Sequence, residues 1–188
     1  GELSGLVTPR VRWAVGALSV IGPSDPTANI WGARWAKMIW NCMGNALAGL
    51  FGQAQLTPEQ QETRGLISVV IGREAAQVAQ ALGVMLESVN DVPLSDFAQA
   101  TTPEQVRAMK LRYDFAQGQR KLTAEQIAWL GAPGRPSLLQ DVIKRRRTEV
   151  EYLNGAIAAK GRELGIPTPM NQAVTEVTLD VELGRAEP

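Results

Sequence analysis

The strongest constraint on the fold is a helical repeat of apolar residues between Arg64 and Glu87. Apolar side chains recur there every three or four residues, which is the spacing of one buried helical face. The repeat consists of Ile67, Val70, Ile71, Ala75, Val78, Leu82 and Met85. Gly83 lies where helices commonly end, and a loop containing Pro93 follows. The spacing predicts one long helix over residues 64–87.

Other segments also read as helices, and strand patterns are scarce. Residues 148–164 and 171–183 carry the same apolar spacing, and residues 30–50 are mostly apolar. A threonine N-cap before an acidic first turn is typical of a helix start. Three tripeptides have this form: Thr57-Pro58-Glu59, Thr102-Pro103-Glu104 and Thr123-Ala124-Glu125. No long alternating segment and no Asn-Gly or Asp-Gly hairpin signal is present, so an all-α fold is predicted.

The first 29 residues differ from the rest of the chain. Residues 1–3, 9–20 and 22–29 could form a strand, a helix and a strand, which would be part of an α/β unit. We therefore place a boundary near Asn29. Residues 1–29 are expected to be a short α/β region, and residues 30–188 a multi-helix domain.

The composition excludes several classes of site. The 188 residues include no histidine, so there is no Ser-His-Asp triad, no Cys-His pair and no His-ligated zinc. The single Cys42 forms no internal disulfide and is read as a small buried hydrophobe, so a reducing, cytoplasmic location and no metal site are expected. Basic and acidic residues balance at 19 each, which argues against nucleic-acid and anionic-membrane partners. No apolar run reaches the roughly 20 residues of a membrane span.

Lys37, Asn41 and Asn45 form a polar stripe on an otherwise apolar helix. Their spacing of four residues places them on one face. The surrounding residues are mostly apolar, so this helix is expected to be buried on most sides. Either Lys37 extends to solvent and the asparagines bridge other elements, or the stripe holds a polar ligand. In the second interpretation Lys37 acts as a general acid and the amides bind substrate hydroxyl or carboxylate groups.

A second polar cluster contains Ser137 and Glu149. Thr148 is expected to cap the helix that follows it, which would place Glu149 in a favourable first turn with a structural role. The basic run from Lys144 to Arg147 is read as a solvated surface, with a phosphate site as the weaker alternative.

Three ordered motifs of this chain resemble those of ketopantoate reductases (2-dehydropantoate 2-reductases). The first is the Lys37-x-x-x-Asn41-x-x-x-Asn45 helix. The second is Pro136-Ser137-Leu138-Leu139-Gln140-Asp141 with Thr148-Glu149-x-x-Tyr152-Leu153-Asn154-Gly155, and the third is Gly165-Ile166-Pro167-Thr168-Pro169-x-Asn171. The resemblance covers residues 1–56 and about 134–180 well, and 64–86 moderately.

The resemblance implies an all-α C-terminal domain like that of 6-phosphogluconate dehydrogenase, preceded by the tail of a nucleotide-binding domain at residues 1–29. It implies reduction of a 2-keto acid by NADPH on the way to pantothenate. Lys37 would be the general acid. Glu149 would orient Lys37 or the substrate hydroxyl at the reacting centre and would also bind the cofactor. Asn41, Asn45 and Ser137 would bind the substrate, and the domain could pair as a homodimer.

Two departures from the family pattern leave alternatives open. The chain contains no Gly-x-Gly, so the dinucleotide-binding turn is absent and the chain alone is expected to be inactive. Residues 92–132 are longer than in compact family members, which leaves the substrate undetermined. A related 2-hydroxyacid dehydrogenase and a non-catalytic helical dimerisation module are the two other hypotheses.

Overall fold

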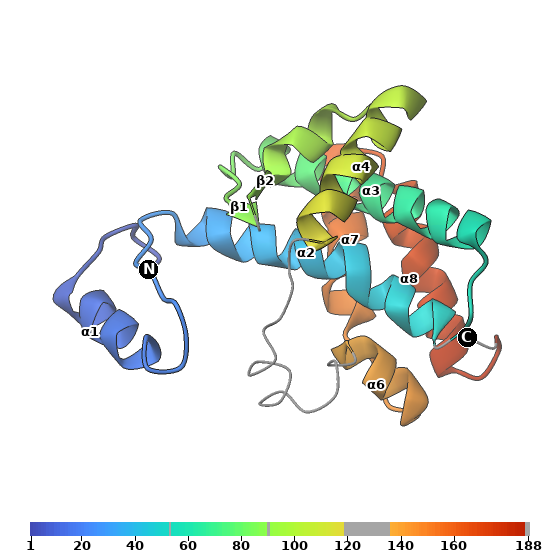
Figure 1. Cartoon of the computed structure of the whole chain (residues 1–188), viewed down its shortest axis with the longest axis horizontal. Helices are drawn as coiled ribbons and strands as arrows, with labels where there is room; N and C mark the ends of the chain where they lie inside the picture. Colours follow the sequence, from blue (N-terminus) through green and yellow to red (C-terminus); the bar gives the residue numbers. More distant parts are fainter. Residues whose placement is uncertain (53, 90, 119–135, 187–188) are drawn as a thin grey trace.

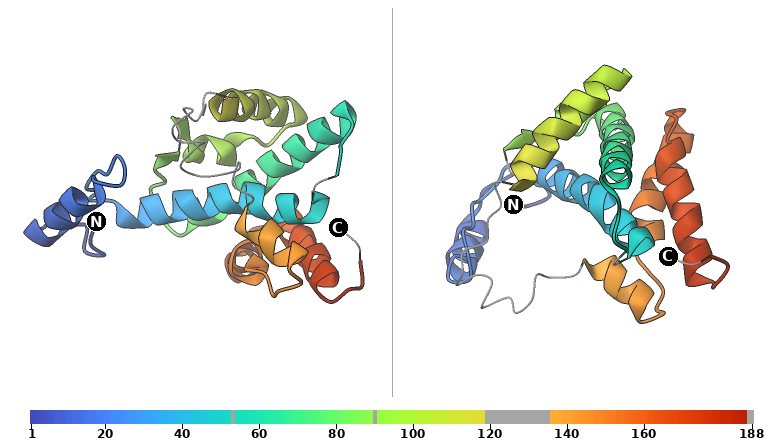
Figure 2. Two further views of the ribbon diagram at one scale, coloured as in Figure 1. Left: turned by 60° about the horizontal axis from the view of Figure 1, so that its bottom comes forward. Right: turned by 45° about the vertical axis from the view of Figure 1, so that its right-hand side comes forward.

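The computed structural model describes residues 1–52, 54–89, 91–118 and 136–186. Helix α2 (Ile30–Phe51) runs through the centre of the helical body, and the helices that follow it in the chain pack around it (Figure 1). On one side lie α3 (Pro58–Ala81) and α4 (Pro103–Gly118); on the other lie α6 (Ser137–Ile143), α7 (Asn154–Leu164) and α8 (Pro169–Glu182), as Figure 2 shows. The predicted all-α architecture is confirmed. The expected helix start at residues 123–125 lies outside the described residues.

The N-terminal region contains one helix and projects from the helical body at the start of α2 (Figure 1). This helix is α1 (Pro9–Leu18), capped by the Thr8 side chain and begun by a proline, whose fixed φ suits a first turn. The strands expected at residues 1–3 and 22–29 are wrong, because residues 1–52 contain no strand. A strand needs a neighbouring strand to bond its backbone, and this region offers only α1.

Helix α3 begins earlier and ends earlier than the apolar spacing predicts. Thr57 and Gln60 form a reciprocal capping box: the Thr57 Oγ1 accepts from the Gln60 N–H at 3.2 Å, and the Gln60 Oε1 accepts from the Thr57 N–H at 2.9 Å. The helix ends at Ala81, and Gly83 follows with φ +73°. The chain then forms a short antiparallel hairpin of β1 (Ser88–Val89) and β2 (Val92–Pro93), and a 3-10 helix, η1 (Leu94–Gln99). The helix start predicted at Thr57-Pro58-Glu59 and the helix predicted over residues 64–87 are therefore parts of one helix, α3.

The start of the helix expected at Thr148 is also wrong. A short 3-10 helix, η2 (Val150–Tyr152), follows Thr148, and α7 begins only at Asn154. The Thr148 hydroxyl donates to Glu182 of α8, and the Thr148 N–H donates to the same carboxylate at 2.9 Å. The Thr148 Oγ1 also accepts from the Val150 N–H at 3.3 Å, so Thr148 caps the short η2 and ties it to α8.

The core lies where α2 meets α3, η1 and the C-terminal helices. Its largest fully buried side chains include Ile39 and Met43 of α2, Ile71 and Val78 of α3, Phe97 of η1, Leu138 of α6 and Ile157 of α7. The start of α2 is tied to the loop after α3 by Asn29, whose Oδ1 accepts from the Gly32 N–H at 3.0 Å. Its Nδ2 donates to the Met85 carbonyl at 2.8 Å. These contacts fix the axis of α2, which carries the predicted polar stripe.

Candidate functional site

The α2 polar stripe (Lys37, Asn41 and Asn45) lies on the open face of this helix. Lys37 is exposed, and both asparagines are half-buried. The other faces of α2 are buried as expected, and Ile39 and Cys42 on those faces are fully buried. Within the described part of the chain, the three stripe side chains make no hydrogen bond or ion pair. Their donors and acceptors are therefore available to a ligand.

Ser137 and Glu149 form a direct hydrogen bond. The Ser137 Oγ donates to the Glu149 Oε1 at 2.9 Å. Ser137 is the first residue of α6, and Glu149 immediately precedes η2, where its side chain makes no capping bond. Both side chains are exposed. The first-turn role expected for Glu149 is therefore replaced by a contact between two of the predicted site residues.

Two observations place this pair beside the C-terminal half of α2. Gly49 of α2 lets α6 approach closely, since a Cβ at this position would lie 2.3 Å from the Cδ2 of the fully buried Leu138. Glu149 also lies near enough to Cys42 to act on its ionisation. Burial raises the pKa of the Cys42 thiol to about 12, and the negative charge of Glu149 adds to the rise. Because Cys42 adjoins Asn41, the two predicted clusters belong to one region.

A buried polar network, which we call the amide network, holds α2 from the opposite side. Asn154 donates from its Nδ2 to the Cys42 carbonyl at 3.3 Å and to the Asn171 Oδ1 at 3.0 Å. Asn171 donates in turn to the Ile71 carbonyl at 3.2 Å and to Glu74 at 2.8 Å. All these side chains are buried, and the Oδ1 of Asn154 has no protein partner. The network joins α2, α3, α7 and α8 at one point.

The sequence alone does not predict this network. Asn154 and Asn171 stand within the quoted motifs, but Glu74 gave no signal beyond an acid in an apolar helix. Glu74 is 1% exposed and accepts from the Met170 and Asn171 N–H groups at 3.0 and 2.9 Å. Three N–H donors thus satisfy this buried carboxylate, as buried polar groups require.

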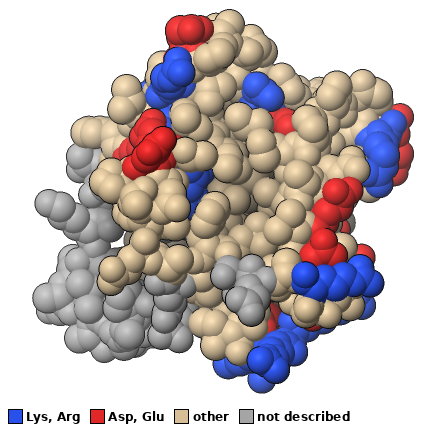
Figure 3. Space-filling model, turned by 90° about the vertical axis from the view of Figure 1, so that its right-hand side faces the viewer, with Lys and Arg blue, Asp and Glu red and all other residues tan. Residues whose placement is uncertain are grey.

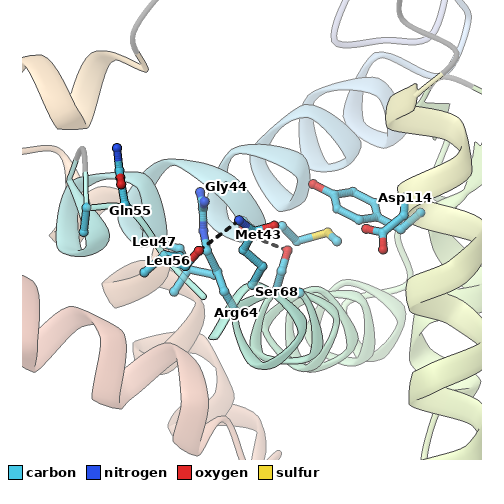
Figure 4. A pocket seen from close by; sticks show the side chains of 12 residues that line it. Met43, Gly44, Leu47, Gln55, Leu56, Arg64, Ser68 and Asp114 are labelled. Carbon is cyan, nitrogen blue, oxygen red and sulfur yellow. Dashed lines mark hydrogen bonds between the residues drawn. The ribbon is translucent and has the colours of Figure 1, made fainter. Parts of the chain in front are cut away.

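A pocket of about 620 Å³ lies between α2, α3 and α4. Gly44 and Leu47 of α2, Arg64 and Ser68 of α3, and Asp114 of α4 are among its lining residues. In Figure 4, Gln55 and Asp114 lie at opposite ends of this pocket, with Gly44, Met43 and Arg64 between them. We call it the Arg64 pocket. No sequence motif indicated it, because its walls come from three helices.

Surface charge, metal-binding groups and helix length restrict the kinds of site that the described residues can form. Acidic and basic side chains are interspersed on the face drawn in Figure 3, as the balanced composition implies. Among the described residues, no group of three or more His, Cys, Asp or Glu side chains is placed to hold a metal ion. No described helix combines the length and apolar character needed to cross a membrane.

Comparison with known proteins settles the family. Residues 29–182 match the family model described as the C-terminal domain of ketopantoate reductase PanE/ApbA. The chain belongs to the ketopantoate reductase family. The match covers all three quoted motifs, so the resemblance inferred from those motifs is confirmed.

Individual relatives agree with this assignment. The 2-dehydropantoate 2-reductase of Archaeoglobus fulgidus is 39% identical over 101 residues, covering 52% of this chain and 33% of the relative. That of Aquifex aeolicus is 39% identical over 64 residues, covering 34% of this chain and 20% of the relative. The chain thus spans a third or less of these relatives.

Solved structures share the fold. The 2-dehydropantoate 2-reductase of Methylococcus capsulatus matches with a TM-score of 0.66 at 23% identity, covering 100% of this chain and 55% of that one. A D-mandelate dehydrogenase solved with NADH and anilino(oxo)acetate matches with a TM-score of 0.60 at 22% identity, covering 93% and 48%. Ketopantoate reductases and D-mandelate dehydrogenases thus share the helical architecture seen in this chain.

Proposed function

We propose that this chain is the substrate-binding and catalytic domain of an NADPH-dependent reductase that converts a 2-keto acid to a 2-hydroxy acid. Ketopantoate is the substrate that the curated relatives favour. The observation that carries the proposal is the Ser137–Glu149 hydrogen bond of 2.9 Å beside an unpartnered stripe of Lys37, Asn41 and Asn45. One cation, two amides and a hydroxyl–carboxylate pair are the groups that reduction of a keto acid requires.

Each residue has a role that its chemistry supports. Lys37 donates a proton to the ketone oxygen, which stabilises charge that grows only in the transition state. Asn41, Asn45 and Ser137 bind the substrate hydroxyl and carboxylate. Glu149 orients Ser137 and lies near the reacting centre and the nicotinamide. NADPH supplies the hydride when bound.

We further propose that residues 1–29 are the tail of a nucleotide-binding domain, which would hold most of the NADPH. Large apolar side chains of this region are exposed, including Trp13 at 75% and Val20 at 88%. Exposed apolar surface of this size is typical of a face that contacts more protein. The chain also lacks a Gly-x-Gly turn, so the dinucleotide phosphates need residues from another segment.

The test is turnover by the native polypeptide containing this chain, with NADPH and ketopantoate. Lys37→Ala is expected to lower kcat by about 10²- to 10⁴-fold, the usual contribution of a general acid. Lys37→Arg is the matched control: it keeps the positive charge but holds its proton too tightly to donate it at neutral pH. It should restore substrate binding but not kcat. Unchanged kcat in Lys37→Ala would refute the mechanism.

Two other functions give different outcomes. A related 2-hydroxyacid dehydrogenase would need the same lysine and reduce another keto acid, so a substrate panel separates it from a ketopantoate reductase. A non-catalytic module would pair with a second copy of itself and bind no nucleotide. Calorimetry with NADPH and NADH, together with sedimentation of the protein, distinguishes this case and measures the proposed homodimer.

A further inference from the structure

Residues 149–164, which comprise Glu149, η2 and α7, meet helix α2 at few points. Helix α7 and η2 pack mainly against each other and against α3 and α8. Helix α6, which begins with Ser137, packs directly on α2, where Leu138 fills the space beside Gly49. Packing therefore fixes the position of Ser137 relative to α2, whereas the position of Glu149 depends on fewer contacts.

Asn154 supplies the hydrogen bond between this segment and α2. Its Nδ2 donates to the Cys42 carbonyl at 3.3 Å, and among the described residues no other hydrogen bond joins residues 149–164 to α2. Both residues are fully buried, and a hydrogen bond shielded from water is electrostatically stronger than an exposed one. Cys42 directly follows Asn41 in the sequence. One buried bond thus joins the segment that contains Glu149 to the α2 polar stripe.

Asn154 is held in one orientation and is linked to Glu149 by a tight turn. Its Nδ2 also donates to the Asn171 Oδ1 at 3.0 Å, which restrains the rotation of the Asn154 side chain. The Glu149 carbonyl accepts from the Tyr152 and Leu153 N–H groups at 3.0 and 3.2 Å, so the backbone between Glu149 and Asn154 is itself hydrogen-bonded. A displacement of Asn154 from α2 would therefore also displace Glu149.

We propose that Asn154 is a positioning residue that sets the separation between Glu149 and the α2 polar stripe. This inference rests on the proposed reduction of a 2-keto acid and deepens it, because the buried Asn154 acts on the reaction only through Glu149. A misplacement of about 1 Å can lower a rate about 10²-fold, so loss of the Asn154 bond should impair the chemical step. Asn41 and Asn45 stay on α2 and Ser137 stays on α6, so substrate binding should change little.

The first experiment removes the Asn154 donor while a side chain of similar size is kept. Asn154→Leu should lower kcat of the native polypeptide with NADPH and ketopantoate about tenfold or more, and should change KM less than about twofold. Ser68→Ala is the matched control, because the buried Ser68 of α3 donates to the neighbouring Met43 carbonyl of α2 at 2.9 Å. This variant also loses a buried bond to α2, so its Tm should fall while kcat stays unchanged. Equal losses of kcat in the two variants would overturn the inference.

A double-mutant cycle separates positioning from a general loss of structure. Glu149→Gln is introduced into the wild-type protein, into Ser68→Ala and into Asn154→Leu. If Asn154 acts through Glu149, the loss of kcat caused by Glu149→Gln should be about tenfold smaller in Asn154→Leu, which has already lost that share. The loss should be undiminished in Ser68→Ala. Full additivity of Glu149→Gln and Asn154→Leu would contradict a role through Glu149.

A distance measurement on the 188-residue chain needs no cofactor and no turnover. A nitroxide is attached at Tyr152→Cys, an exposed position of η2, while the buried Cys42 stays unlabelled. The nitroxide broadens the side-chain amide NMR signal of Asn41, and this effect falls steeply with distance. We expect weaker broadening in Asn154→Leu and the wild-type broadening in Ser68→Ala.

The distance measurement also distinguishes failure of this inference from failure of the proposed function. Unchanged broadening in folded Asn154→Leu overturns the inference even if the native polypeptide reduces ketopantoate. Weaker broadening supports the positioning of Glu149 even if no keto acid is reduced. If Asn154→Leu does not fold, Asn154→Ser replaces it, because the serine hydroxyl is too short to reach the Cys42 carbonyl, and the same two outcomes apply.

Discussion

The Ser137 Oγ lies 2.9 Å from the Glu149 Oε1 and joins the start of α6 to the turn before η2. Both side chains are exposed, so the bond adds little to the stability of the fold. An exposed serine–carboxylate pair at the edge of a polar helix face is better suited to bind a substrate than to stabilise the protein. Measurements of activity and of stability can therefore distinguish a substrate-binding role of this pair from a structural one.

The Glu149→Gln substitution is expected to change activity much more than stability. The amide can still accept the Ser137 hydrogen bond but carries no charge, so the change in unfolding free energy should stay below about 1 kcal/mol. If Glu149 acts near the reacting centre, kcat should fall by about 10²-fold or more. Urea unfolding and steady-state kinetics measure the two effects. Glu151→Gln, which alters a nearby surface ion pair with Arg147, is the control, and equal effects of both variants would contradict the assignment.

The amide network should respond strongly to loss of Asn171. Asn171→Ala removes the buried side-chain bonds to Glu74, to the Asn154 Nδ2 and to the Ile71 carbonyl, which together should cost about 1–3 kcal/mol. For a chain of this length each kcal/mol lowers Tm by about 2–4 °C. Calorimetric melting measures the change. Gln172→Ala, which removes only an exposed bond to Glu176, should alter Tm little, and a similar drop in both variants would show that the network is not special.

Cys42 should be unreactive in the folded protein across the neutral range. Its pKa is raised to about 12 from 9.0, chiefly by burial, so the thiol stays protonated. A disulfide reagent should modify it only after unfolding in urea. Because the folded pKa lies above the unfolded one, its contribution to stability is present below about pH 9 and declines as pH rises toward 12. Cys42→Ala should abolish that share of the alkaline decline; rapid labelling of the folded protein at pH 8 would contradict the burial.

Arg145 occupies a backbone conformation that favours glycine. Its φ is +52°, just after the last turn of α6, where its N–H donates to the Val142 carbonyl at 3.0 Å. Arg145→Gly should raise the free energy of unfolding by about 1 kcal/mol, because it removes the clash of the Cβ in this region. The neighbouring Arg146→Gly lacks this benefit and should be neutral or destabilising. Chemical unfolding of both variants checks the difference, and equal effects would show that the strain is absent.

Much of the fold was predictable because it depends on local patterns. The apolar spacing placed α2, α3 and α8, and the Thr57 and Thr102 signals located the starts of α3 and α4. The errors arise where a distant contact decides the local structure. Thr148 bonds to Glu182 of α8 as well as to the Val150 N–H, and no α-helix starts there. The N-terminal strands needed partners that residues 1–52 do not contain.

The candidate site also has parts that the sequence predicts and parts that it does not. The α2 polar stripe was predictable because one helix carries all three residues, and the motifs paired Ser137 with Glu149. The amide network and the Arg64 pocket were not predictable, because their residues come from separate helices. Asn154 and Cys42, for example, are joined by a contact between α7 and α2.

Helix α2 is held from its buried side, where Asn154 bonds to the Cys42 carbonyl and Ile39 and Met43 enter the core. Its opposite face contributes little to folding. Residues there can therefore be exchanged at low thermodynamic cost, so substrate preference can diverge among related proteins while the scaffold is kept. Asn41 and Asn45, which are half-buried on that face, mark where such divergence would begin.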